Sequence, residues 1–125
     1  MDAGSSHIMS ILRQLNNETH PENIRFFKSL PIEYYGYLLK NASCIVGNSS
    51  SGIREAAYFG TPNVCVGTRQ IGRETGKNTI ICDISEIKQS INYQLNHGRY
   101  APDLLYGNGN ASTEIFLHLL FEDYL

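Results

Sequence analysis

The sequence has no strong excess of charge, few cysteines and no long apolar run. Its formal net charge of -2 over 125 residues argues against a general nucleic-acid-binding protein, which needs a basic surface. No apolar run approaches the length of a membrane span, and the start MDAGSSHIMS lacks the basic and apolar regions of a signal peptide. We therefore expect a cytoplasmic protein that has neither nucleic acid nor a membrane as its partner.

The three cysteines, Cys44, Cys65 and Cys82, lie inside or at the end of apolar runs. No C-x-x-C pair and no nearby histidine accompany them, so the sequence predicts reduced, buried thiols and no metal site. Hydrophobic residues make up 42% of the chain, which is typical of a packed globular protein. The length predicts a single domain over residues 1–125.

Helical and strand patterns alternate along the chain. Helices are expected at residues 5–15, 31–42, 51–60, 85–97 and 111–125, and strands at 23–30, 44–49, 61–67 and 79–83. Short strands that are apolar on both faces indicate a parallel sheet covered by helices, a Rossmann-like α/β fold. A doubly wound domain normally begins on a strand, whereas this chain begins on a helix. We therefore expect the sheet to lack its first strand and to expose an edge that pairs with another chain.

A turn of small polar residues, GNSSSG at Gly47–Gly52, separates a predicted strand from a predicted helix. Ligands bind at the carboxyl ends of the strands in open α/β sheets, and the N-terminus of a helix there offers free N–H groups to an anion. Ser49 and Ser50 add hydroxyl donors, and Glu55 could accept from ribose hydroxyls. The turn is not a P-loop, because it lacks the lysine, and it contains neither G-x-G-x-x-G nor G-x-S-x-G. A capped helix without a ligand remains the alternative.

Two further stretches follow predicted strands. Residues 67–78, GTRQIGRETGKN, carry Arg69, Arg73 and Lys77, and the planar fork of arginine suits phosphate. A solvated loop is the alternative for this stretch. The backbone around Leu30 could read the edge of a base, although the sequence alone favours a plain strand end before a helix that begins at Pro31. Two anion-binding loops at neighbouring strand ends together favour a ligand that contains phosphate.

Four stretches resemble one family: DAGS at 2–5, GNSSSGIREAAYFGTP at 47–62, GTRQIGRETGKN at 67–78 and YGNGNAS at 106–112. They are similar to the C-terminal part of the hydrolysing UDP-N-acetylglucosamine 2-epimerases of the sialic-acid pathway. The non-hydrolysing enzymes carry an SDSGG-like turn and a TTERPE-like loop, which this sequence lacks. The resemblance implies one half of a two-domain GT-B fold, with UDP in the cleft between the domains.

The resemblance also implies roles for individual residues. Ser49 and Ser50 would hold the diphosphate, Glu55 the ribose hydroxyls, and Arg69 the nucleotide, while the backbone of Leu30 would contact uracil. The possible supporting positions are Gly47, Asn48, Gly52, Gln70 and Arg73. The implied reaction hydrolyses UDP-N-acetylglucosamine to N-acetylmannosamine and UDP, without a cofactor.

No catalytic residue can be assigned in this sequence, because the family's acid and base groups belong to an N-terminal domain that it lacks. His7 lies in no family motif, and His118 is expected to pack on an apolar helix rather than to act in catalysis. We therefore expect an inactive, UDP-binding half-enzyme whose partners are UDP-N-acetylglucosamine or UDP, the missing N-terminal domain and a second copy of the chain. The alternatives are a free-standing nucleotide-sugar-binding module and the C-terminal domain of a non-hydrolysing epimerase or a GT-B glycosyltransferase.

Overall fold

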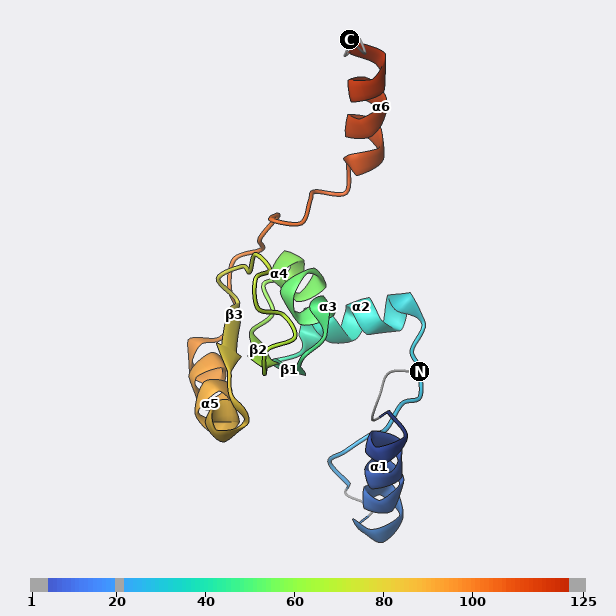
Figure 1. Cartoon of the computed structure of the whole chain (residues 1–125), viewed down its shortest axis with the longest axis vertical. Coiled ribbons are helices and arrows are strands. Elements are labelled where there is room, and N and C mark those ends of the chain that lie inside the picture. Colours follow the sequence, from blue (N-terminus) through green and yellow to red (C-terminus); the bar gives the residue numbers. More distant parts are fainter. Residues whose placement is uncertain (1–4, 20–21, 122–125) are drawn as a thin grey trace. The chain divides into compact units, whose positions relative to one another are not determined.

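A computed structural model describes residues 5–19 and 22–121 (Figure 1). The chain divides into two compact units, Met1–Pro31 and Ile32–Leu125. Residues 2–4 of the DAGS stretch lie outside the described residues.

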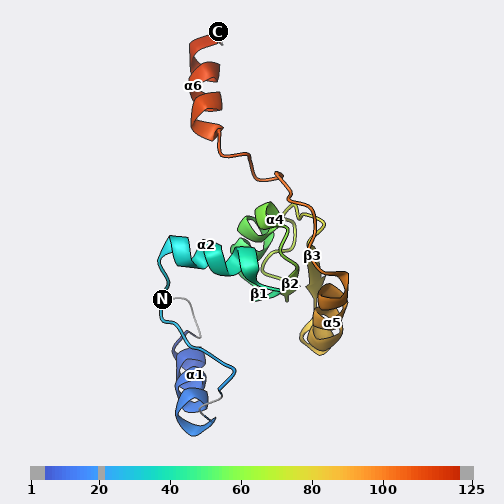
Figure 2. The same cartoon turned by 180° about the vertical axis from the view of Figure 1, so that it is seen from behind.

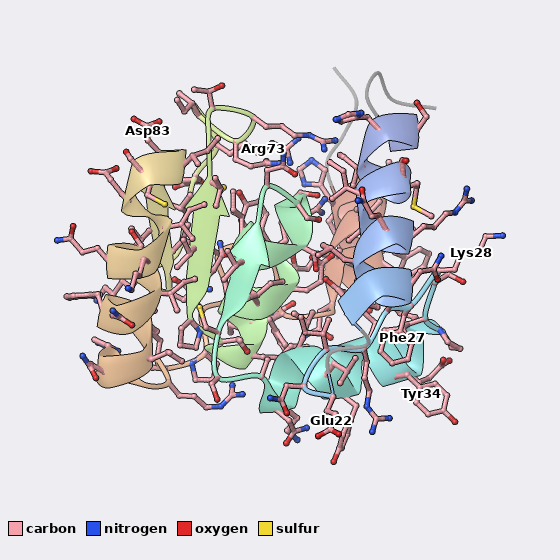
Figure 3. The ribbon with its side chains drawn as sticks, turned by 90° about the horizontal axis from the view of Figure 1, so that it is seen from below. Glu22, Phe27, Lys28, Tyr34, Arg73 and Asp83 are labelled. Atoms are coloured by element: carbon pink, nitrogen blue, oxygen red, sulfur yellow. The ribbon has the colours of Figure 1, made fainter. Side chains whose placement is uncertain are left out.

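The first unit contains one helix, α1 (Ser5–Thr19), as the apolar spacing predicts. The expected strand at residues 23–30 is wrong, because these residues form neither a strand nor a helix. Phe27 and Lys28, labelled in Figure 3, belong to this irregular segment. A strand is stable only when its backbone pairs with a neighbour, and the described part of this unit contains no second strand.

The second unit contains a three-stranded parallel sheet in the order β1-β2-β3. The strands are β1 (Ile45–Gly47), β2 (Asn63–Val66) and β3 (Thr79–Cys82), and Val46, Val64 and Ile80 lie side by side in the register. This arrangement confirms the predicted α/β class with a Rossmann-like parallel sheet. Because the strands are parallel and paired, the residues that follow each of them emerge at one edge of the sheet.

Helices flank this sheet (Figures 1 and 2). These elements are α2 (Ile32–Asn41), α3 (Ser50–Ile53), α4 (Glu55–Phe59), the 3₁₀ turn η1 (Ile84–Glu86) and α5 (Ile87–His97). A further helix, α6 (Ala111–Phe121), follows them in the chain and has no buried residue. Helix α3 lies against β1 and β2, and α5 lies against β2 and β3.

Two helix boundaries differ from the sequence prediction. The single helix expected at residues 51–60 is interrupted at Arg54, whose φ of −92° and ψ of −71° leave the regular helical geometry. Asp83, rather than the expected Ser85, is the N-cap residue of η1, and its N–H donates to Glu86 Oε2 at 3.1 Å. Gly60 ends α4 in the left-handed conformation, as predicted.

The apolar core surrounds the central strand β2. The buried apolar residues are Leu39, Ile53, Ala56, Ala57, Val64, Cys65 and Cys82. The outer strands are covered less completely than expected, since Val46 and Ile81 are 44% and 43% exposed. The three cysteines are free thiols as predicted, and burial raises the pKa of Cys44 and Cys65.

Two polar side chains near the end of α5 tie distant segments together. The Arg99 guanidinium donates to the carbonyl oxygens of Phe59 (3.1 Å), Ala42 (3.0 Å) and Lys40 and to Thr61 Oγ1 (3.2 Å). It therefore satisfies backbone groups at the C-terminal ends of α2 and α4, which have no partner within their own helices. Gln94 Nε2 donates to the carbonyl oxygens of Asn63 (2.9 Å) and Asn78 (2.8 Å), at the start of the sheet.

Helix α6 is apolar along its length, and its side chains are exposed. Phe116 and Phe121 are 59% and 79% exposed. His118 is exposed as well, so the expectation that it packs in an apolar environment is wrong. In the part of the chain that the structure describes, no helix is long and apolar enough to cross a membrane.

Candidate functional site

The turn that follows β1 is organised by serine side chains. Ser49 is the N-cap residue of α3, and its Oγ accepts from the Ser51 N–H at 3.3 Å. The Tyr35 hydroxyl donates to Ser51 Oγ at 2.8 Å, which ties helix α2 to the turn. Ser49 is exposed and Ser50 is half-buried, whereas the N–H groups of Ser51 and Gly52 already donate to the Oγ and the carbonyl oxygen of Ser49. The turn therefore presents mainly the hydroxyl groups of Ser49 and Ser50 at the carboxyl end of β1.

Gly52 has a structural explanation that does not require a ligand. A Cβ atom built on Gly52 would lie 2.4 Å from Oδ1 of Asn63, in β2. Only a residue without a side chain allows α3 to approach the strand this closely. Gly52 thus allows α3 to pack closely against β2.

The loop at residues 67–78 leaves β2 at the same edge of the sheet. Two successive turns shape it, in which the Ile71 N–H donates to the Thr68 carbonyl (3.1 Å) and the Arg73 N–H to the Gln70 carbonyl (3.2 Å). Figure 3 shows Arg73 at the same end of the sheet as Asp83, which directly follows β3. Arg69 and Arg73 are both exposed, so their guanidinium groups are accessible to an anion.

A buried side chain connects this loop to the turn. Gln70 Nε2 donates to the carbonyl oxygen of Asn48 at 2.8 Å. Gln70 is only 3% exposed, and its Oε1 is buried without a hydrogen-bond partner. The two stretches that the sequence analysis singled out as anion-binding loops are therefore in direct contact.

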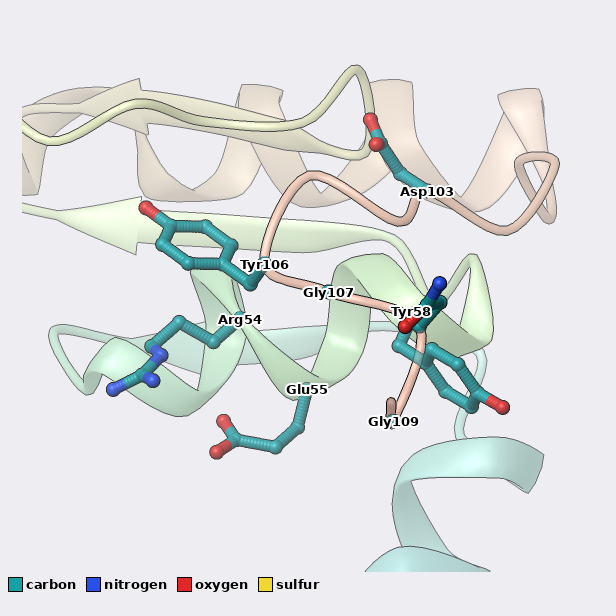
Figure 4. Close-up of a pocket in the computed structure, with 8 residues that line it drawn as sticks. Arg54, Glu55, Tyr58, Asp103, Tyr106, Gly107 and Gly109 are labelled. Carbon is teal, nitrogen blue, oxygen red and sulfur yellow. The ribbon is translucent and has the colours of Figure 1, made fainter. Parts of the chain in front are cut away.

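Glu55 lies in the first turn of α4 and lines a pocket of about 290 Å³ (Figure 4). The opposite wall is the segment at residues 103–109, which includes Tyr106, Gly107 and Asn108. Arg54 and Tyr58 complete the lining on the α4 side. The pocket combines the carboxylates of Glu55 and Asp103, a guanidinium and two phenol rings, a set that suits a polar ring bearing hydroxyl groups.

Sequence reasoning did not assign Arg54, Tyr58 or Tyr106 to a site. The Arg54 guanidinium lies over the Tyr106 ring, 5.5 Å from its centroid, and the Tyr106 hydroxyl donates to the Glu74 carbonyl at 2.5 Å. Tyr106 therefore joins the 67–78 loop to the wall of the pocket. The YGNGNAS stretch was the available signal, although the sequence alone identified it only as a loop.

Leu30 belongs to the first unit, so its contact with a base stays a prediction. Among residues 5–19 and 22–121, no group of three or more His, Cys, Asp and Glu side chains could hold a metal ion. The donors of the turn and loop suit the oxygens of a phosphate, and the neighbouring carboxylate of Glu55 suits hydroxyl groups.

Comparison with known proteins identifies the family. The family model described as UDP-N-acetylglucosamine 2-epimerase matches residues 1–120. The chain belongs to this family. Its Gly/Ser turn, arginine loop and YGNGNAS segment all fall within the residues that match the epimerase model.

Individual 2-epimerases give the same result. The UDP-N-acetylglucosamine 2-epimerase of Neisseria meningitidis serogroup B is 35% identical over 136 residues, covering 96% of this chain and 36% of the relative. The UDP-N,N'-diacetylbacillosamine 2-epimerase (hydrolyzing) of Legionella pneumophila is 32% identical over 117 residues, covering 92% of this chain and 30% of the relative. The GDP/UDP-N,N'-diacetylbacillosamine 2-epimerase (hydrolyzing) of Campylobacter jejuni is 39% identical over 66 residues, covering 53% and 17%. The chain thus spans about a third or less of the length of the curated relatives it matches.

Proposed function

We propose that this chain is the C-terminal, UDP-binding half of a hydrolysing UDP-N-acetylglucosamine 2-epimerase. The complete cytoplasmic enzyme would convert UDP-N-acetylglucosamine and water to N-acetylmannosamine and UDP for sialic-acid synthesis. The observation that carries the proposal is the contact between the Gly47–Gly52 turn and the 67–78 loop through the Gln70–Asn48 hydrogen bond. Two of the matched relatives are named as hydrolysing enzymes, which favours this branch of the family.

In this proposal the diphosphate binds at the turn. The hydroxyls of Ser49 and Ser50 donate to phosphate oxygens, and Arg69 contributes a charged donor from the neighbouring loop. Glu55 accepts from the ribose hydroxyls at the rim of its pocket. The backbone of Leu30 contacts the uracil ring in the assembled enzyme.

The contribution of this half to the reaction is electrostatic. When the bond between the sugar and UDP breaks, negative charge develops on the diphosphate, and donors already aimed at it lower the barrier. The groups that move protons on the sugar would belong to the N-terminal domain. The chain alone should therefore bind UDP weakly and release no N-acetylmannosamine. The complete enzyme would be a homo-oligomer.

Calorimetric titration of the chain with UDP tests this proposal, together with an assay for released N-acetylmannosamine. Arg69→Ala should weaken UDP binding about two- to fivefold, because an exposed charged contact contributes up to about 1 kcal/mol. Lys40→Ala removes an exposed cation that precedes β1, at the opposite edge of the sheet, and His118→Ala alters an exposed residue of α6. Both control variants should bind UDP as the unaltered chain does. Absence of UDP binding at millimolar concentration would contradict the proposal, and sugar release by the pure chain would contradict the assignment of catalysis to the other domain.

A further inference from the structure

Gln70 is a buried amide that uses only half of its hydrogen-bonding capacity. Its Nε2 donates to the Asn48 carbonyl at 2.8 Å, whereas its Oε1 is buried and has no partner. A buried acceptor without a partner costs at least as much stability as one amide-to-carbonyl hydrogen bond contributes. The stability of the fold therefore does not account for a glutamine at this position.

Gln94 provides an internal comparison, because it is the same side chain and is also buried, at 0% exposure. Its Nε2 donates to two carbonyl oxygens, those of Asn63 and Asn78, and its Oε1 accepts from the Tyr100 hydroxyl at 2.8 Å. All of these bonds stabilise the folded chain. Gln94 is thus explained by stability, and Gln70 is not.

The position of Gln70 supplies the missing explanation. Helix α3 has four residues, which is too short for the helix to hold the turn in place by itself. Asn48 and Ser49 are the exposed residues of the turn, and the hydrogen bond from Gln70 attaches this exposed part to the 67–78 loop. Arg69 is the neighbouring residue in the chain, and the same attachment therefore fixes the start of the arginine loop against the turn.

We propose that Gln70 is a positioning residue that holds the Gly47–Gly52 turn and the 67–78 loop in the arrangement that binds a diphosphate. This inference rests on the proposed function. The donors of the turn and the guanidinium of Arg69 must reach phosphate oxygens of one ligand at the same time. A hydrogen bond made before the ligand arrives reduces the ordering that binding would otherwise require.

The test compares Gln70→Met with Gln94→Met in the full 125-residue chain. Methionine keeps most of the side-chain volume and removes every hydrogen bond. Gln70→Met should keep or raise the melting temperature, because it removes the unpaired buried oxygen, while the Asn48 carbonyl can bind water. It should weaken the binding of UDP and of inorganic pyrophosphate roughly three- to tenfold, the equivalent of one neutral hydrogen bond. Gln94→Met should lower the melting temperature and leave both affinities unchanged, measured at a temperature at which the variant remains folded.

Backbone amide NMR signals provide a second readout that does not depend on Gln94→Met being stable. In Gln70→Met, the signals of residues 48–52 should shift or broaden, while those of α5 should stay in place. A lower melting temperature for Gln70→Met with unchanged UDP affinity would assign Gln70 a purely structural role and overturn the inference. Equal UDP binding by Gln70→Met and the unaltered chain would overturn the inference and leave the proposed function standing. Absence of UDP binding by the unaltered chain would overturn both.

Discussion

Replacement of Gly60 by alanine should destabilise the second unit severely. Gly60 has φ 65° and ψ 23°, a left-handed conformation that costs a residue with a side chain about 1–2 kcal/mol. A Cβ atom there would also lie 2.1 Å from the carbonyl oxygen of Tyr100. This distance is far inside van der Waals contact, so the backbone itself has to move.

The backbone around Tyr100 is not free to move without further loss. The Tyr100 N–H donates to the Gly60 carbonyl, and the Asp103 N–H donates to the Ala57 carbonyl, both at 2.9 Å. Forcing additional atoms into a packed site typically costs about 1–3 kcal/mol. The strain and the displacement together predict that Gly60→Ala lowers the free energy of unfolding by about 2–5 kcal/mol.

Urea unfolding followed by circular dichroism measures this change. Gly72→Ala is the matched control, because Gly72 has φ 85° but nothing lies within 4 Å of the position of its Cβ atom. The control should lose at most about 2 kcal/mol, from the left-handed strain alone. If Gly60→Ala is no less stable than Gly72→Ala, the close approach of the Tyr100 carbonyl does not constrain the fold and the reasoning is wrong.

Three other predictions concern packing, pH and association. Gly52→Ala should lower the free energy of unfolding in the unaltered chain, because the added Cβ atom meets the Asn63 side chain. In a chain that already carries Asn63→Ala, the same change should cost much less. A double-mutant cycle by urea unfolding measures the coupling between the two sites, and a coupling near zero would contradict this contact. Burial raises the pKa of Cys44 and Cys65, so the folded chain holds these two protons more tightly than the unfolded chain does. The stability should therefore be fully present below the ordinary thiol pKa, and it should fall as the pH rises from there through the raised pKa of the folded chain. Urea midpoints that are the same at pH 7 and pH 10 would refute that linkage. The exposed apolar side chains of α6 should drive self-association, and Phe116→Glu should reduce it. Light scattering at several concentrations measures this association, and a monomeric unaltered chain would contradict the prediction.

The parallel sheet, and the edge of it where the candidate site lies, were predictable because their signals in the sequence are local. Each strand is a short apolar run, and each is followed by small or polar residues that cannot continue it. Gly60 was a recognisable helix stop for the same reason, since its left-handed conformation depends on its own backbone. These features required no knowledge of what packs against them.

Several of the wrong or missing predictions depend on distant residues. The segment at 23–30 has strand-forming side chains, but a strand also requires a partner, which the sequence pattern does not reveal. The Gln70–Asn48 bond joins residues 22 positions apart, and the pocket at Glu55 is closed by the segment at 103–109. Neither contact leaves a periodic trace in the sequence. The YGNGNAS stretch indicated that the second segment matters, without showing which surface it meets.

The bonds that close this fold come late in the chain, and this affects the order in which the protein can fold during its synthesis. The last strand ends at Cys82, whereas the side chains of Gln94 and Arg99, which hold the start of the sheet and the ends of α2 and α4, follow it. While the polypeptide grows from its N-terminus, all three strands exist before the residues that lock them together have been made. The nascent sheet therefore has its own strand pairing, without these hydrogen bonds, until α5 and Arg99 have left the ribosome. Premature termination shortly after Cys82 would release a chain that carries the three strands of this sheet but lacks the side-chain hydrogen bonds of Gln94 and Arg99.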